Sequence, residues 1–291
     1  MRGSFPFTAP TWPGGAERRP LERRTGTDYD IAWARRYPAR VARALIVDQV
    51  LRPVVRVLAS PQVHGLDRVE TLDPPAIFAA NHSSHLDTPL LLTSLPERFR
   101  HRAVVAAGAD YFFPNRVAGA VSALAIGAFP IERHRVSRRS SDLAAEFLDD
   151  GWSLIIFPEG GRSPDGWGQA FRAGAAYLSL RTGCPVVPVH LEGTRRVLKR
   201  GAKVPTRATV NVTFGSPLRT RDGDDARSFG PRIEAAVARL ADERTTDWWT
   251  ARRRAAAGHT PSLTGPDARS WRRTWALDES RRPRAEHRWP R

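Results

Sequence analysis

The stretch AIFAANHSSHLD (residues 76–87) runs from small and apolar residues directly into a polar cluster. Its first five residues are typical of a buried strand, and the next seven hold two histidines, two serines, an asparagine and an aspartate. In α/β proteins, side chains at the ends of buried strands often form the ligand site. Three interpretations of the cluster are open: a metal site, a helix cap with incidental histidines, or a catalytic base with its orienting carboxylate.

Each interpretation uses different side chains of the cluster. A metal site would use His82, His85 and Asp87, but an HxxH pair alone is a weak metal signal and no further Cys/His cluster supports it. A cap would use Ser84 or Asp87 ahead of a helix expected over residues 89–95, which leaves His82 unexplained. A base would pair His82 with Asp87, because a carboxylate on one imidazole nitrogen leaves the other free to take a proton. On a regular helix the two side chains would point about 140° apart, so their pairing needs a turn between strand and helix.

Short apolar runs alternate with helix-like stretches along the middle of the chain. The runs expected to be strands are 76–80, 103–107, 125–131, 153–157, 186–191 and 208–214. The stretches expected to be helices are 89–95, 116–124, 140–150, 173–182 and 231–244. Such alternation is typical of α/β proteins. The sequence therefore predicts a single layered α/β domain with a largely parallel central sheet flanked by helices, preceded by an amphipathic N-terminal helical segment.

That N-terminal segment, residues 31–59, has the pattern of an amphipathic helix with a basic polar face. The apolar positions are Val41, Leu45, Ile46, Val50, Leu51, Val54, Val55 and Leu58, and the basic ones are Arg40, Arg43, Arg52 and Arg56. Pro38 and Pro53 should break or kink this helix. The pattern fits a helix in a membrane interface, with its arginines on lipid phosphates, and it also fits a helix packed on the domain.

Composition divides the chain into four parts. Residues 1–29 are rich in Pro, Gly, Arg and Thr and are expected to be disordered, and residues 30–61 form the amphipathic segment. Residues 62–249 form the α/β domain, and residues 250–291 form a basic tail, rich in Arg and Trp, that is expected to be mostly disordered. Tryptophan beside arginine is favoured both at lipid headgroups and on single-stranded nucleic acid.

Charge and cysteine content indicate which class of partner and which cellular compartment to expect. The formal net charge of +16 comes almost entirely from arginine and suggests a polyanionic partner, or else a general use of Arg in place of Lys. The one cysteine, Cys184, excludes an intrachain disulfide and fits a reducing compartment. The longest uncharged run, residues 117–131, is shorter than the roughly 20 residues that span a bilayer, so no transmembrane helix is expected. The N-terminus has no apolar core typical of a signal peptide.

Three further strands are expected to end in polar or glycine-containing segments. These segments are GAFPIERHR (127–135), SLIIFPEGGRSPDGWG (153–168) and VVPVHLEGT (186–194). In the second of them, Gly160 and Gly161 allow close backbone approach, and Arg162 offers a fork for phosphate or carboxylate. Glu159 beside them can accept a hydroxyl or bind an arginine. Four clusters at strand ends in one domain predict one shared cleft.

Taken together, the four segments resemble the motifs of the glycerolipid acyltransferases, the PlsC-like family of 1-acyl-sn-glycerol-3-phosphate acyltransferases. The matching residues are Asn81, His82 and Asp87 of an NHx4D motif; Gly127, Ile131, Glu132 and Arg133 of a second motif; Phe157, Pro158, Glu159, Gly160, Arg162 and Ser163 of an FPEGTRS motif; and Val187, Pro188, Val189 and Gly193 of a fourth. The resemblance covers roughly residues 62–220, and the order and spacing of the motifs both agree with it.

The resemblance implies the glycerolipid acyltransferase fold and a reaction. A fatty acyl group would move from acyl-CoA or acyl-carrier protein to the free hydroxyl of 1-acyl-glycerol-3-phosphate, giving phosphatidic acid. His82 would take the hydroxyl proton and Asp87 would orient His82. The substrate-binding residues implied are Arg133, Glu159, Gly160, Arg162 and Ser163, with Arg133 and Arg162 on the acceptor phosphate. Neither a cofactor nor a metal is required.

The sequence departs from the family pattern at three positions. Gly161 replaces the usual Thr of the third motif, His85 stands where an aromatic residue is frequent, and Arg172 stands where Lys is common. None of these removes a catalytic element, but the acceptor stays open: glycerol-3-phosphate, another lysophospholipid or another polar lipid could take its place. A non-catalytic lipid-binding scaffold and a nucleic-acid-binding protein are remoter alternatives.

The expected partners are the acyl donor, a lysophospholipid acceptor and an anionic membrane surface, contacted peripherally on the cytoplasmic side. No nucleic acid is expected, since the sequence lacks a recognisable binding motif. The oligomeric state cannot be read from the sequence.

Overall fold

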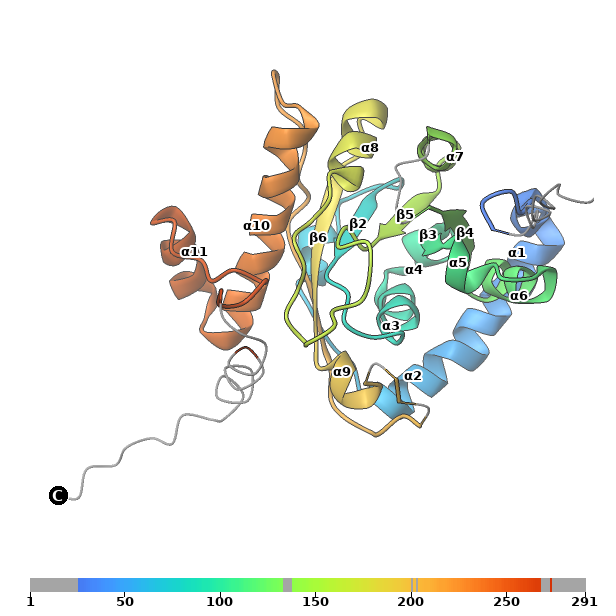
Figure 1. Cartoon of the computed structure of the whole chain (residues 1–291), viewed down its shortest axis with the longest axis horizontal. Helices are drawn as coiled ribbons and strands as arrows, with labels where there is room; N and C mark the ends of the chain where they lie inside the picture. Colours follow the sequence, from blue (N-terminus) through green and yellow to red (C-terminus); the bar gives the residue numbers. More distant parts are fainter. Residues whose placement is uncertain (1–25, 133–137, 200, 203, 268–272, 274–291) are drawn as a thin grey trace, which may run out of the picture.

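One seven-stranded sheet lies between two layers of helices in the computed structural model, which describes residues 26–132, 138–199, 201–202, 204–267 and 273 (Figure 1). The strands are β1 (Gln62–His64), β2 (Ile77–Ala80), β3 (Ala103–Gly108), β4 (Ala128–Ile131), β5 (Ser153–Ile156), β6 (Val186–Glu192) and β7 (Asn211–Phe214). Their order across the sheet is β1-β7-β6-β2-β5-β3-β4. All neighbouring pairs are parallel except β6 and β7, so the predicted fold class is confirmed.

The helices occupy the segments between these strands and both ends of the described chain. They are α1 (Tyr37–Leu45), α2 (Arg52–Ala59), α3 (Asp87–Ser94), α4 (Glu97–Arg100), α5 (Ala109–Phe112), α6 (Arg116–Ile126), α7 (Arg138–Asp149), α8 (Gly174–Thr182), α9 (Thr194–Val197), α10 (Ala226–Thr245) and α11 (Trp248–Ala256). Short 3-10 turns cover Ala32–Arg35 and Leu66–Val69, and a π-helical segment, η2 (Ile46–Leu51), joins α1 to α2. Each of the five predicted helices is present.

The strands bury both of their faces, because alternate side chains enter two separate cores. Phe78 and Ala80 of β2 pack with α2 and α3, whereas Ile77 and Ala79 pack with α7, α8 and the first part of α10. Figure 1 shows these two helix layers on opposite sides of the sheet. A sheet covered on both faces leaves the two ends of its strands as the places for a site. The side where the strands begin is here called the amino edge, and the side where they end is called the carboxyl edge.

Two predicted strands begin three residues later than expected. The run 125–131 forms a strand only from Ala128, because α6 continues to Ile126 and ends at Gly127, whose φ of 67° is left-handed. The run 208–214 becomes β7 only at Asn211. Before it, the N–H groups of Ala208 and Val210 donate to the carbonyls of Leu58 and Ala59 at the end of α2. The three-residue strand β1 carried too short a pattern to be predicted.

The N-terminal segment is helical, as predicted, but its prolines do not break it. Pro38 lies in the first turn of α1, where no N–H is needed. Pro53 lies in the first turn of α2, and the preceding η2 carries the chain through with wider turns, in which the N–H of Arg52 bonds to the carbonyl of Val47, five residues back. The chain therefore stays helical from Tyr37 to Ala59.

The expectation that arginines of this segment face lipid phosphates is wrong for Arg43. Its side chain is buried, donates to the carbonyl of His101 and lies 5.2 Å from the ring centre of Trp152. Arg40 stacks over the same tryptophan ring at 5.5 Å. These two arginines hold α1 on the domain through cation–π contacts, because their long side chains can cover apolar surface.

The opposite side of the segment exposes a line of apolar side chains, here called the exposed apolar stripe. Its members are Tyr37 (77% exposed), Val41 (41%), Leu45 (58%), Val50 (54%), Val54 (48%) and Val57 (54%). They recur at steps of three or four residues except for the step of five from Leu45 to Val50, which spans η2. Because a π-helix takes more residues per turn, the longer step keeps the stripe on one side. None of the described helices is long and apolar enough to cross a membrane.

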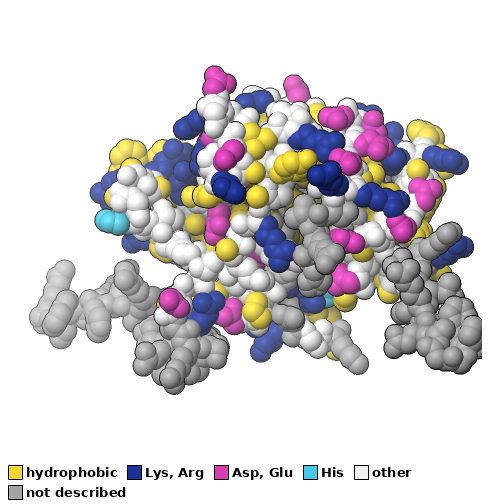
Figure 2. Space-filling model, turned by 45° about the horizontal axis from the view of Figure 1, so that its top comes forward, with side chains coloured by type: hydrophobic (Ala, Val, Ile, Leu, Met, Phe, Trp, Pro, Cys, Tyr) yellow, Lys and Arg dark blue, Asp and Glu magenta, His cyan; other side chains and the backbone are white. Residues whose placement is uncertain are grey.

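The expected tail boundary at residue 250 falls inside α11, so described structure continues through residue 267. Residues 1–25, most of the expected N-terminal disordered part, lie outside the described residues, as do residues 268–272 and 274–291 of the tail. On the face drawn in Figure 2, Lys and Arg side chains are interspersed with Asp and Glu and do not gather into one basic stripe.

Candidate active site

The turn after β2 is held in place by Asn81, the first residue of the polar cluster. Its amide nitrogen donates to the carbonyl of Leu191 at 2.9 Å, and its amide oxygen accepts the N–H of the same residue at 2.7 Å. Asn81 thus continues the pairing of β2 with β6 through its side chain, at the point where the backbone of β2 leaves the sheet. His82 follows directly at the carboxyl edge of the sheet.

His82 and Asp87 are brought together as predicted, by a turn between β2 and α3. Nδ1 of His82 lies 2.8 Å from Oδ2 of Asp87, whose side chain is fully buried at the first residue of α3. The same oxygen accepts the backbone N–H groups of Ser83 at 2.6 Å and Ser84 at 2.8 Å. Three donors therefore converge on one carboxylate oxygen. With Nδ1–H directed at Asp87, Nε2 is the nitrogen that can take a proton.

The cap interpretation and the base interpretation are not exclusive, because the hydroxyl of Ser84 accepts the N–H of Leu86, just before α3, at 3.2 Å. The residue before α3 is Leu86, and it makes no side-chain cap hydrogen bond. The carboxylate of Asp87 turns back to the N–H groups that precede the helix. Within the described residues, no group of three or more His, Cys, Asp or Glu side chains is arranged to hold a metal ion.

The imidazole of His82 is fixed by a second segment as well. The ring of Phe157, at the end of β5, stacks on it with ring centres 4.2 Å apart and planes 21° apart. The backbone carbonyl of His82 accepts the N–H of Ser163 at 2.9 Å. Stacking and backbone pairing leave the ring little freedom to turn, so the direction of Nε2 is set before a substrate arrives.

Glu159 links the two segments through its carboxylate. Oε1 accepts the backbone N–H of His82 at 2.8 Å, and Oε2 accepts that of Gln169 at 2.9 Å. Burial raises the pKa of Glu159 to about 7, although the two N–H groups act in the opposite direction; the carboxylates of Asp87 and Glu234 add to the rise. Since only 2% of Glu159 is exposed, these contacts assign it to holding the loop that carries Arg162.

The two glycines of this loop differ in what surrounds them. Gly160 has a left-handed φ of 73°, which favours glycine, and a Cβ there would lie 2.8 Å from Cζ of Arg172, whose side chain would have to move. A Cβ on Gly161 would meet nothing within 4 Å, and its φ is not left-handed. The departure from the family pattern at Gly161 therefore leaves open space beside Arg162 and is not imposed by the backbone.

The end of β6 completes the carboxyl edge. Gly193 has a left-handed φ of 87°, and a Cβ there would lie 3.0 Å from the carbonyl oxygen of Thr209. The next residue, Thr194, is fully buried, and its hydroxyl lies 3.0 Å from that of Ser83. Thr194 was not predicted as a site residue, because a single threonine after a strand carries no sequence signal.

The remaining predicted residues include one that shapes the loop, one that is half-buried and one that lies outside the described residues. Ser163 is buried and its hydroxyl accepts the N–H of Gly166 at 2.7 Å, so it shapes the loop. Arg162 is half-buried, and Arg133 lies outside the described residues. Three other motif residues occupy structural positions: Gly127 ends α6, Ile131 ends the edge strand β4, and Pro188 lies inside β6 against Gly215.

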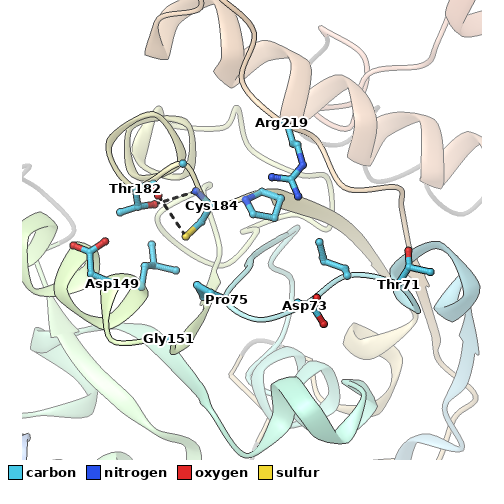
Figure 3. Close-up of a pocket in the computed structure, with 12 residues that line it drawn as sticks. Thr71, Asp73, Pro75, Asp149, Gly151, Thr182, Cys184 and Arg219 are labelled. Carbon is cyan, nitrogen blue, oxygen red and sulfur yellow. Dashed lines mark hydrogen bonds between the residues drawn. The ribbon is translucent and has the colours of Figure 1, made fainter.

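A pocket of about 490 Å³ lies at the opposite, amino edge of the sheet (Figure 3). Its lining includes Pro75 before β2, Gly151 before β5 and Cys184 before β6, and none of the predicted site residues. Cys184 is buried there, with its sulfur 3.9 Å from the carbonyl oxygen of Thr182. The paired histidine and carboxylate lie at the carboxyl edge, so we take that edge as the candidate active site.

Known proteins share both this sequence region and this fold. The acyltransferase family model matches residues 60–192. A chloroplastic 1-acyl-sn-glycerol-3-phosphate acyltransferase of Arabidopsis thaliana is 30% identical over 165 residues, which cover 56% of this chain and 44% of that protein. The human 1-acyl-sn-glycerol-3-phosphate acyltransferase beta is 32% identical over 159 residues, covering 51% of this chain and 55% of that protein. The resemblance indicated by the four motifs is confirmed.

A solved structure is similar in fold. The crystal structure of the 1-acyl-sn-glycerophosphate acyltransferase PlsC from Thermotoga maritima superposes with a TM-score of 0.57 at 24% identity, covering 75% of this chain and 84% of that one. The chain spans about half the length of the two curated relatives named above.

Proposed function

We propose, since residues 60–192 of this chain belong to the acyltransferase family, that the chain transfers a fatty acyl group to the free hydroxyl of 1-acyl-glycerol-3-phosphate, giving phosphatidic acid. The observation that carries the proposal is the contact of 2.8 Å between Nδ1 of His82 and the buried carboxylate of Asp87. The names of the relatives support the choice of acceptor.

The chemistry follows from this pair. Nε2 of His82 takes the proton of the acceptor hydroxyl while the hydroxyl oxygen attacks the thioester carbonyl of the donor. A carbon–oxygen bond forms, the carbon–sulfur bond breaks, and the imidazolium returns the proton to the leaving thiolate. The carboxylate of Asp87 stabilises the imidazolium between these two transfers. No acyl-enzyme forms, because the nucleophile belongs to the acceptor.

Binding of the acceptor phosphate needs cationic side chains near His82, at the carboxyl edge of the sheet. Arg162 is on the loop that Glu159 and Ser163 hold against His82, which places it three residues from one anchor and next to the other. Arg133, outside the described residues, is the second residue after β4 in the sequence. We assign both arginines to the phosphate, because guanidinium groups bind phosphate in a bidentate manner.

The exposed apolar stripe supports contact with a membrane surface, from which the acceptor would be drawn. Val117 and Val121 of α6, which are 74% and 60% exposed, add to it, since α6 packs beside α1. Tyr111 of α5, next to α6, stacks on His85 of the catalytic turn with ring centres 4.8 Å apart. Aliphatic side chains in line on a helix are suited to the acyl-chain boundary of a bilayer.

We place this contact on the cytoplasmic side of the membrane, because a single cysteine fits a reducing compartment. The donor is acyl-CoA or acyl-carrier protein. The stacked and exposed Trp248 and Trp249 of α11 lie at the other end of the molecule from α1 and α6 (Figure 1). The main membrane surface in this proposal is therefore that of α1, α2 and α6.

The acceptor is tested with a panel of hydroxyl compounds. Purified protein with oleoyl-CoA and mixed vesicles is offered 1-acyl-glycerol-3-phosphate, glycerol-3-phosphate or a lysophospholipid with a larger headgroup, and products are identified by mass spectrometry. We expect phosphatidic acid as the main product. A main product from another acceptor would keep the chemistry and replace the substrate; no acylated product from any acceptor would refute the proposed function.

A further inference from the structure

The loop that carries Arg162 is held from outside by a segment near the C-terminus, here called the C-terminal strap: residues 262–267 and Arg273. The N–H of Gly168 donates to the carbonyl of Leu263 at 2.8 Å. The indole N–H of Trp167 donates to the carbonyl of Arg273, also at 2.8 Å. Both acceptors lie beyond the region matched by the family model.

Two side-chain contacts add to these backbone bonds. Nε of Arg273 donates to Oδ2 of Asp165 at 2.9 Å, with each side chain about one quarter exposed (24% and 23%). Gly265 lies so close to Trp167 that a Cβ there would be 2.3 Å from the indole. Partial burial raises the pKa of Asp165, but hydrogen bonds from Arg273 and from the N–H of Trp167 outweigh it, and the pKa lies below its usual value.

A short chain of hydrogen bonds connects the strap to the catalytic histidine. Asp165, bound by Arg273, accepts the N–H of Trp167 with its other oxygen. The next bond in the turn runs from the N–H of Gly166 to the hydroxyl of Ser163, and the N–H of Ser163 donates to the carbonyl of His82. The strap therefore touches the turn that carries both Arg162 and an anchor of His82.

We propose that the C-terminal strap is a positioning element of the active site, which sets the loop of Arg162 for the acceptor phosphate through Trp167 and Asp165. The inference rests on the proposed function. Arg273, Asp165 and Trp167 are positioning residues: they act through Arg162 and Ser163 and need not touch the substrate.

The chain offers a matched pair of glycines for the test. Gly265 and Gly258 both have left-handed φ values, 73° and 72°, so alanine strains the backbone equally at either position. Only at Gly265 would the new methyl group strike Trp167; at Gly258 it would meet nothing within 4 Å. A difference between Gly265→Ala and Gly258→Ala therefore reports the contact with the loop.

The full-length variants are compared by steady-state kinetics and by amide hydrogen exchange of the loop, residues 160–172. For Gly265→Ala we expect the acceptor KM to rise about tenfold, with the donor KM unchanged and with faster exchange at Trp167 and Gly168. For Gly258→Ala we expect values within about twofold of wild type. A purely structural loss would lower the active fraction, and so kcat, without a change in either KM.

Arg273→Gln and Asp165→Asn provide a second route if Gly265→Ala does not fold. Each should raise the acceptor KM about threefold to fivefold, and the double variant should be no worse than either single one, because both remove the same ion pair. Arg273→Lys should recover part of the loss. Equal acceptor KM and equal loop exchange in wild type and Gly265→Ala, or in wild type and Arg273→Gln, would overturn the proposal. Wild-type protein without any acyl transfer would refute the proposed function instead, and loop exchange would still test the strap.

Discussion

At the scale of single residues, Asp87 and Glu159 are two buried carboxylates with different tasks. Asp87 receives three donors on one oxygen, one of them from the imidazole of His82. Glu159 receives two backbone N–H groups, and burial raises its pKa to about 7. In the proposed mechanism Asp87 therefore acts on the ring that moves the proton, whereas Glu159 holds the backbone around that ring.

Asp87→Asn tests the first of these tasks. An amide cannot stabilise the imidazolium as a carboxylate does, so we expect kcat to fall by about 10²–10⁴-fold with little change in the acceptor KM. The measurement is steady-state release of CoA. Asp149→Asn, at an exposed position at the end of α7, serves as the control and should keep wild-type kcat. Equal kcat in Asp87→Asn and wild type would remove Asp87 from the mechanism.

Glu159→Gln tests the task of Glu159, which is to hold the backbone around His82, through the pH dependence of stability. Because burial raises the pKa of Glu159 from 4.5 to about 7, the folded protein holds this proton where the unfolded chain has lost it. The free energy of unfolding contributed by Glu159 should therefore fall as the pH rises from about 4.5 to about 7, by at most about 3 kcal/mol. The difference between wild type and Glu159→Gln in urea unfolding should show this slope.

A second buried group, His190, changes the stability with pH in the opposite direction over an overlapping pH range. Burial lowers the pKa of His190 to about 4, so its contribution to stability rises with pH up to the usual histidine range. His190 is present in both proteins, and the comparison cancels its effect. Parallel pH curves for wild type and Glu159→Gln would contradict the assignment of the raised pKa.

The neighbouring glycines of the loop give a prediction about stability. Gly160→Ala should lower the free energy of unfolding by about 1–2 kcal/mol or more, because its φ is left-handed and the new Cβ would strike Arg172. Gly161→Ala should change it by less than about 0.5 kcal/mol, since that Cβ would meet nothing within 4 Å. Denaturant unfolding measures both; a larger loss in Gly161→Ala than in Gly160→Ala would contradict the described loop.

At the scale of elements, the sequence pattern located the helices better than it located their faces. The recurrence of apolar residues predicted a helix over the N-terminal segment, and α1, η2 and α2 confirm it. It did not show that Arg43 turns inward onto Trp152, because the partner ring is more than 100 residues away in the sequence. Nor did it predict η2, since a π-helical segment has no distinct composition.

The exposed apolar stripe predicts how the protein binds vesicles. Leu45→Ser with Val54→Ser removes two of its exposed side chains, so we expect at least a tenfold weaker affinity for mixed anionic vesicles in sedimentation. The control is Val204→Ser, which changes a side chain that is 76% exposed and lies outside the stripe, and this variant should bind as wild type does. Val63→Ser is unsuitable as a control because β1 is part of the sheet. Undiminished binding of the double variant would refute the membrane contact.

At the scale of the whole molecule, the layered fold and the contact between His82 and Asp87 could be predicted because their signals are local. Buried strands are short apolar runs, and His82 and Asp87 lie five residues apart. The C-terminal strap could not be predicted, because its contacts join residues 106 and 108 positions apart. Trp167 and Gly265 look like ordinary loop residues until folding places them together. The composition of the tail suggested disorder, and α11 with the strap shows that part of it is structured.

Deprotonation of the acceptor hydroxyl by His82 is tested by following CoA release from oleoyl-CoA with and without 1-acyl-glycerol-3-phosphate. Wild type should release CoA only when the acceptor is present, without a burst in its absence, because no acyl-enzyme forms. His82→Ala, shown to be folded by its unfolding curve, should lose this release. Acceptor-dependent release that persists in folded His82→Ala would show that His82 is not the base.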